Sequence, residues 1–254
     1  MAWSDLRGFF TDTFLAALYR TRRWWILTAL ANVGASLVIG WWFLSHPQFE
    51  SSLMSPSEID KLVTADFENY YSEFAASHFA ARVWTNNAWL TAIVIAVGIL
   101  GVPVIYLLFQ NVLNLAAIGA IMINHDRGAL FFGLILPHGL LELTAVFVAG
   151  ATGLRLFWAW IDPGPRTRGR AVAEEGRSAM AVALGLVVVL AASGAIEAFV
   201  TPSPLPTWAR VSIGVIAELA FIAYVFTVGR WAWQRGGTGD VAARDAGDTA
   251  PVVG

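Results

Sequence analysis

The chain has 254 residues, a formal net charge of −2, 57% hydrophobic residues and only 13% charged residues. Soluble proteins carry about a quarter charged residues, so this chain lacks the polar surface that water requires and is expected to lie in a lipid bilayer. The small net charge excludes a nucleic-acid-binding protein, and the absence of cysteine excludes disulfides and thiolate chemistry.

Residues 1–23 are predicted to form an amphipathic helix followed by an anchor. One helical stripe contains Trp3, Leu6, Phe9, Phe10, Thr13, Phe14, Ala17 and Leu18. We expect this helix to lie at the cytoplasmic membrane surface, with a soluble helix packed on cytoplasmic loops as the alternative. The basic and aromatic run 20–25 that follows is typical of a bilayer interface.

The first predicted span covers residues 24–44, close to the ~20 residues that a hydrocarbon core requires. Residues 46–87 then form the largest polar segment, which we expect to be helical and external. Ser57 is a candidate N-cap in it, with Asp60 three residues later.

Residues 88–123 are apolar over a length that fits two spans. The break is expected between Gly98 and Asn111, because Pro103 removes a backbone donor and the glycines before it loosen the helix.

Three further spans are predicted at 129–160, 178–200 and 208–231, which gives a six-span all-α bundle within residues 24–233. Residues 234–254 have no apolar period and are expected to be a disordered cytoplasmic tail.

Six spans place twelve arginines on one side of the membrane and four basic residues on the other. The four are Lys61, Arg82, Arg127 and Arg210. Because basic loops stay in the cytoplasm, both termini are predicted to be cytoplasmic. The excess of arginine over lysine favours a GC-rich bacterial genome and therefore a bacterial inner membrane.

Three segments resemble the stage II sporulation protein M family. They are Tyr106–Asn111, the run Leu136–Glu142 that continues to Ala149–Arg155, and the pair Asn86 and Asn87 before a span. The central match is a Pro-His-Gly-x-x-Glu segment on a helix that ends in small residues and Gly-Leu-Arg. Val112 stands where the family often has glycine, so a close helix approach is not expected there.

The resemblance implies a membrane scaffold. Members in spore formers act with septal peptidoglycan hydrolases, and related proteins occur in bacteria that form no spores. Membrane or envelope proteins, peptidoglycan-remodelling enzymes among them, are therefore the implied partners. Membrane lipid surrounds the chain, and a homo-oligomer is a further expectation.

His138 and Glu142 lie at i and i+4, so both side chains share one face of the span 129–160. A charge near mid-bilayer is unfavourable, so neither is expected to face lipid. Three interpretations stay open: a hydrogen-bonded pair that fixes helix packing, which we favour, a proton or ion relay, and a metal site for intramembrane hydrolysis. The metal site lacks a third ligand in the sequence.

Glu218 lies near the middle of the last span and is expected to face Asn, Thr or His groups inside the bundle. The named candidates for this contact are Asn32, Gln110, Asn111 and Asn114. Glu197 lies near the outer end of its span and is expected to be solvated there.

Pro137, Gly139, Gly150 and Gly153 are predicted to form close helix contacts, with the tightest contact of the bundle at the turn of Pro137 and Gly139.

The sequence therefore predicts a non-enzymatic inner-membrane scaffold that needs no cofactor. The main alternative is a small-solute, ion or proton transporter that uses His138, Glu142 and Glu218. An intramembrane metal-dependent hydrolase is a further alternative.

Overall fold

The computed structural model describes residues 3–66 and 76–240, and the elements of these residues are all helical. In chain order they are α1 (Trp3–Gly8), η1 (Phe9–Thr13), α2 (Phe14–Arg20), α3 (Arg22–Ser45), η2 (Pro47–Phe49), α4 (Glu50–Leu53), α5 (Pro56–Lys61), η3 (Leu62–Asp66), α7 (Ala76–Ala96), η4 (Val97–Leu100), α8 (Val102–Asn124), α9 (Gly128–Ile161), α10 (Arg168–Ala195), η5 (Ile196–Val200), α11 (Thr207–Tyr224), η6 (Val225–Gly229) and α12 (Arg230–Gln234). The η elements are short 3-10 or π segments.

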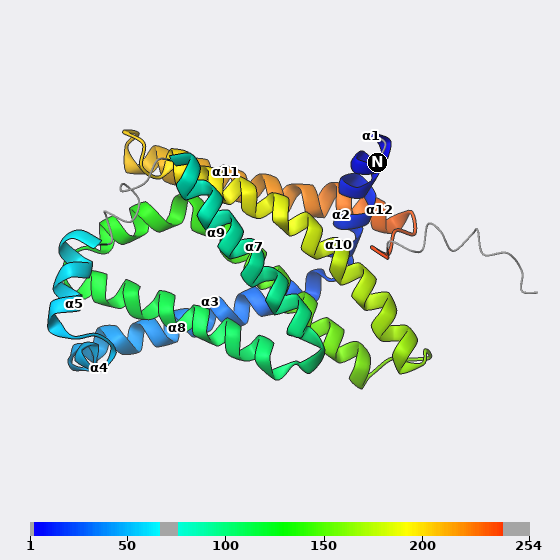
Figure 1. The fold of residues 1–254 in the computed structure, drawn as a ribbon, viewed down its shortest axis with the longest axis horizontal. Coiled ribbons are helices and arrows are strands. Elements are labelled where there is room, and N and C mark those ends of the chain that lie inside the picture. The colour runs from blue at the N-terminus through cyan, green and yellow to red at the C-terminus, as the bar shows by residue number, and fades with distance from the viewer. Residues whose placement is uncertain (1–2, 67–75, 241–254) are drawn as a thin grey trace, which may run out of the picture.

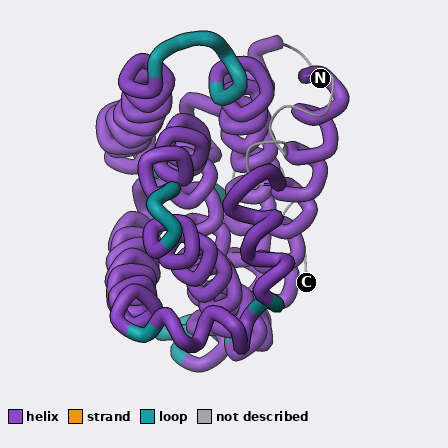
Figure 2. The backbone as a smooth tube through the Cα atoms, turned by 90° about the vertical axis from the view of Figure 1, so that its left-hand side faces the viewer, coloured by secondary structure: helices purple, strands orange, loops and turns teal. Residues whose placement is uncertain are grey.

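The long helices form one elongated bundle with two distinct ends (Figure 1). The Glu50 end, at the left of Figure 1, carries α4, α5 and the turns after α8 and η5. The Glu175 end carries α1, α2, α12 and the turn between α9 and α10. Figure 2 looks at the bundle from the Glu50 end and shows several of these helices nearly end-on.

Helix α9 is the centre of the bundle. It packs against α3, α7, α8, α10 and α11. Its sequence is apolar apart from a few polar residues such as His138, Glu142 and Arg155, which is typical of a helix that other helices surround. Small residues let two neighbours approach closely: a Cβ atom on Gly98 would lie 2.5 Å from the Gly153 Cα atom, and one on Gly150 would meet the Leu108 side chain.

Within residues 3–66 and 76–240, five helices are long and apolar enough to cross a membrane. They are Arg22–Ser45, Val102–Asn124, Gly128–Ile161, Arg168–Val200 and Thr207–Gln234. The remaining predicted span corresponds to a shorter apolar helix, Asn87–Leu100, at the end of α7 and η4. The chain is thus a multi-pass helical membrane protein, and the sixth crossing stays a prediction.

The break within residues 88–123 lies at Gly101, inside the predicted window. Gly101 has a φ of +69°, a left-handed conformation that favours glycine. Pro103 follows in the first turn of α8, where a helix needs no backbone donor. The chain therefore reverses between η4 and α8, and the N–H group that Pro103 lacks is not needed for a hydrogen bond inside α8.

The N-terminal segment differs from the predicted interfacial helix. It is divided into α1, η1 and α2, and every residue from Phe14 to Tyr19 is buried. Helix α2 packs against α10, η6 and α12. An apolar stripe fits a membrane surface and a protein groove equally well, and here the groove binds it.

The polar segment and the tail also differ from their predicted limits. Helix α7 already begins at Ala76, inside the predicted external segment 46–87. The α5 helix is capped by Ser55 and Glu58 in a capping box, two residues before the predicted cap at Ser57. Part of the predicted disordered tail is fixed, because Arg177 donates two hydrogen bonds to Asp240 at 2.6 and 2.7 Å.

Candidate functional site

The site is a cluster of polar side chains within the bundle, between α7, α9 and the end of α10. We call it the polar cluster and define it as Asn87, His138, Glu142, Glu197 and Thr201. His138 and Glu142 lie one helical turn apart on α9, as their spacing predicts. His138 is buried, with 4% of its surface exposed, and Glu142 is half-buried.

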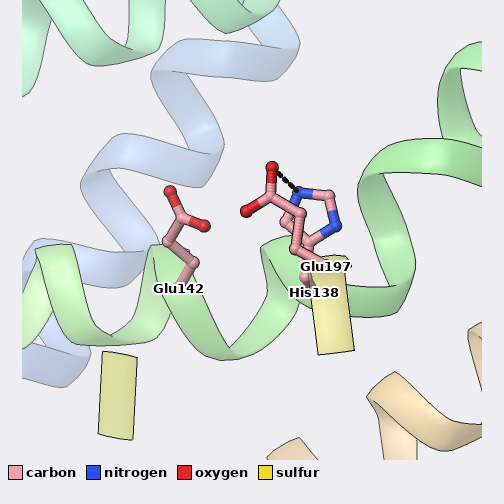
Figure 3. Close-up of side chains that lie close together, drawn as sticks. All are labelled: His138, Glu142 and Glu197. Carbon is pink, nitrogen blue, oxygen red and sulfur yellow. Dashed lines mark ion pairs between the residues drawn. The ribbon is translucent and has the colours of Figure 1, made fainter. Parts of the chain in front are cut away.

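Glu197 joins this cluster, contrary to the expectation that it is solvated. Only 4% of its surface is exposed, and its Oε1 atom lies 3.8 Å from His138 Nε2 (Figure 3). The reason is local: residues 196–200 form a π-helical turn, in which the Thr201 N–H donates to the Ile196 carbonyl oxygen. This wider turn and the packing of η5 on α9 place Glu197 inside the bundle.

The remaining members orient these three side chains. Asn87 Nδ2 donates a hydrogen bond of 2.8 Å to Glu142 Oε1. Thr201 Oγ1 lies 3.3 Å from His138 Nδ1, on the side of the ring away from Glu197. Ser193 donates to the His138 carbonyl oxygen at 3.0 Å and joins α10 to α9. The polar cluster therefore connects three separate helices.

The two carboxylates create an electrostatic problem within the cluster. One oxygen of each lies within 4.8 Å of the other and of a His138 ring nitrogen. One ionised carboxylate inside a bilayer costs about 2.5–3.5 kcal/mol, and a second one nearby adds repulsion. Arg210 donates to the Thr201 carbonyl and to Thr207 Oγ1, and not to either carboxylate of the cluster. The cluster therefore needs a proton or a cation between its carboxylates.

Glu218 occupies a separate position on α11. It is half-buried, and its Oε1 atom accepts a hydrogen bond of 2.8 Å from Thr144 on α9. A threonine thus makes this contact, as one of the expected residue types, whereas the named candidate Asn32 donates to the Thr28 carbonyl within α3. Glu218 thus links α11 to α9 without taking part in the polar cluster.

Comparison with known proteins identifies the family. The model described as SpoIIM, stage II sporulation protein M, matches residues 29–202. The chain belongs to the stage II sporulation protein M family. The matched range contains all five residues of the polar cluster, whereas Glu218 lies outside it. No curated protein and no solved structure matches the chain.

The other residues that the sequence singled out within the family region lie apart from the polar cluster. Asn114 is exposed and Asn111 is half-buried, and no hydrogen bond joins either one to a described side chain. The side chain of Asn86 lies outside the described residues.

The close contact at Pro137 involves a different glycine from the predicted one. A Cβ atom on Gly139 would meet only Ile135 of its own helix. A Cβ atom on Gly214 of α11 would instead lie 2.2 Å from the Pro137 carbonyl oxygen. Gly214 therefore lets α11 approach α9, and Gly139 does not.

A second polar cluster, which sequence reasoning missed, fixes the Glu175 end. Glu175 accepts two hydrogen bonds from Arg20 at 2.7 and 2.8 Å and two from Arg155, both at 3.0 Å. Arg20 also donates to Ser178 at 2.9 Å. These contacts join α2, α9 and α10. The Gly-Leu-Arg motif that ends in Arg155 was the available signal, because an arginine within a long apolar helix requires an anion.

Proposed function

We propose that this member of the stage II sporulation protein M family is a non-enzymatic membrane scaffold. Its role is to hold cell-envelope proteins, peptidoglycan-remodelling enzymes among them, at fixed positions on the membrane. Family membership supports a membrane protein of this type, and the resemblance discussed above supports the class of partner. The family match offers no support for the transporter alternative.

The observation that carries the proposal is a segment fastened to the Glu50 end of the bundle. Glu50 is buried, with 7% of its surface exposed, and accepts a hydrogen bond of 2.7 Å from Asn124. Its other oxygen lies 3.2 Å from His125 Nε2. These contacts fix the start of α4 on the turn between α8 and α9. A fixed segment presents a partner with a pre-organised surface, which reduces the entropy lost on binding.

The same segment exposes apolar side chains. Phe49 and Leu53 are 42% and 45% exposed on η2 and α4. We propose that these two side chains lie outside the bilayer and form part of the surface that a partner protein contacts. We place this surface on the external side, because the arginine-rich Glu175 end belongs in the cytoplasm by the positive-inside rule. The proposal includes six crossings of a bacterial inner membrane, which together with this orientation leave both termini in the cytoplasm.

Site-specific photo-cross-linking tests the proposal. A photoreactive amino acid replaces Phe49 or Leu53 in cells, with Leu184, which is exposed on the membrane-spanning part of α10, as the control position. We expect a defined adduct with an envelope protein from the first two positions and none from the third. The Glu50→Ala variant should weaken that adduct at unchanged abundance, because it releases the segment.

Two results would contradict the scaffold. One is the absence of any protein adduct from Phe49 and Leu53 in chains of normal abundance. The other is an adduct formed only between copies of this chain, which would make the surface a homo-oligomer contact.

A further inference from the structure

The arrangement of donor atoms in the polar cluster fits a metal ion. A metal site needs a third ligand besides His138 and Glu142, and the sequence alone does not show one. Glu197, 55 positions from Glu142 in the sequence, supplies it in the structure. We propose that His138, Glu142 and Glu197 bind one divalent transition-metal ion.

The distances allow this with small side-chain movements. One donor atom from each residue lies within 4.8 Å of the other two. The centre of an equilateral triangle with that edge is about 2.8 Å from each corner, against roughly 2.0–2.2 Å for zinc bonded to nitrogen or oxygen. A movement of less than about 1 Å by each donor atom brings all three to bonding distance from the ion. In Figure 3 the two carboxylates face each other beside the imidazole.

Glu197 gives an independent indication of a ligand. Its carboxylate is 96% buried, by its exposed fraction of 4%, and its Oε2 atom is a buried atom without a hydrogen-bond partner. An unsatisfied buried carboxylate oxygen is rare in proteins and unfavourable by several kcal/mol in a low-dielectric interior. A cation bound between Glu197 and Glu142 satisfies this oxygen.

The surrounding hydrogen bonds orient the donors as metal sites require. Thr201 Oγ1 has one proton, which it donates to the Ile196 carbonyl oxygen at 3.4 Å. This donation leaves Thr201 Oγ1 able to accept from a His138 Nδ1–H, which is the tautomer that has the ring lone pair on Nε2, toward Glu197. Asn87 donates to Glu142 in the same way. Such outer hydrogen bonds fix the tautomer and the orientation of metal ligands.

Charge and donor chemistry indicate the class of ion. Two carboxylates and a divalent cation sum to zero, which removes the charge that a bilayer interior disfavours. One imidazole nitrogen with two carboxylate oxygens suits zinc and its transition-metal neighbours better than magnesium or calcium, which prefer oxygen ligands alone. Three protein ligands leave a fourth tetrahedral position for water. The ion would also join α9 to η5.

Metal binding by the purified full chain tests the proposal. The protein is prepared with a tag that contains no histidine, stripped with a chelator and titrated with Zn²⁺ and, separately, with Co²⁺. The chain contains no cysteine, so visible Co²⁺ absorption reports nitrogen and oxygen ligands only. We expect one equivalent of Zn²⁺ to bind and to raise the melting temperature.

Variants locate the ion. Glu197→Gln and His138→Gln should abolish binding, and Thr201→Val should weaken it about 10- to 100-fold through the lost outer hydrogen bond. Glu218→Gln is the matched control, because that carboxylate is also in a membrane span but contacts Thr144 instead. It should bind Zn²⁺ like the wild type.

Two outcomes overturn the proposal. The first is a stripped wild-type chain that neither binds Zn²⁺ stoichiometrically nor melts at a higher temperature with it, a result that needs no variant to fold. The second is unchanged binding by Glu197→Gln and His138→Gln, which would place the ion outside the polar cluster.

Discussion

The Glu175 cluster allows the most direct test of how the N-terminal segment is held. Glu175 is 5% exposed and pairs with Arg20 and Arg155, whose side chains are 21% and 26% exposed. The Glu175→Gln substitution keeps the shape of the side chain but leaves two guanidinium groups together without an anion. Loss of one partner of a buried ion pair costs about 3–5 kcal/mol, and partial solvation of the arginines reduces this to roughly 2–4 kcal/mol.

The effect should be visible in thermal unfolding. For a chain of this size, 2–4 kcal/mol corresponds to a loss of melting temperature on the order of 5–15 °C. Intrinsic tryptophan fluorescence of the detergent-purified protein measures it. Arg20 contacts both Glu175 and Ser178, so proteolysis within α1 and α2 should accelerate at the same time.

Glu174→Gln is the matched control for this prediction. Glu174 is the neighbouring residue and pairs with Arg166 and Arg170, but its side chain is 26% exposed against 5% for Glu175, and that of Arg170 is 74% exposed. Exposed ion pairs contribute little to stability, so the control should melt close to the wild type. Equal melting temperatures for Glu175→Gln and Glu174→Gln would refute the reasoning, because burial would then make no difference.

Three further predictions follow from single positions. Gly214→Ala should destabilise the protein by about 1–3 kcal/mol, because its Cβ atom would lie 2.2 Å from the Pro137 carbonyl oxygen. Gly34 is the control, because a Cβ atom there would have no neighbour within 4 Å. Gly34→Ala should be neutral or stabilising in the same thermal unfolding assay. A single cysteine at Ser57 should react with an impermeant maleimide in intact spheroplasts and one at Thr167 only after lysis; the reverse pattern contradicts the orientation. Hydrogen bonds from the Ser55 hydroxyl and backbone N–H lower the pKa of Glu58 below its ordinary 4.5. The stability that this cap gives α5 is therefore fully present above pH 4.5 and is lost as the pH falls through the lowered pKa of Glu58. Hydrogen exchange of residues 55–61, compared at each pH with the intrinsic rate of an unprotected amide, should show less protection at acidic pH, and Glu58→Gln should remove that dependence.

Much of the architecture is a local property of the sequence. Apolar run length predicts the helices that cross the membrane, since a span needs about 20 apolar residues whatever its neighbours. The combination of Gly101 and Pro103 predicts the reversal between η4 and α8, because each residue restricts its own backbone. The shared face of His138 and Glu142 likewise follows from the helical repeat alone.

Tertiary structure decided which partners these residues have. The position of Glu197 near a helix end favours solvation, and only the π turn and the packing of η5 on α9 bury it beside His138. The apolar stripe of the N-terminal segment does not distinguish lipid from protein, and α2 is buried because Gly185 leaves room for Phe14. Likewise, Gly214 rather than Gly139 makes the contact at Pro137. Periodicity describes one helix at a time, whereas each of these contacts depends on the relative placement of two helices, which distant residues determine.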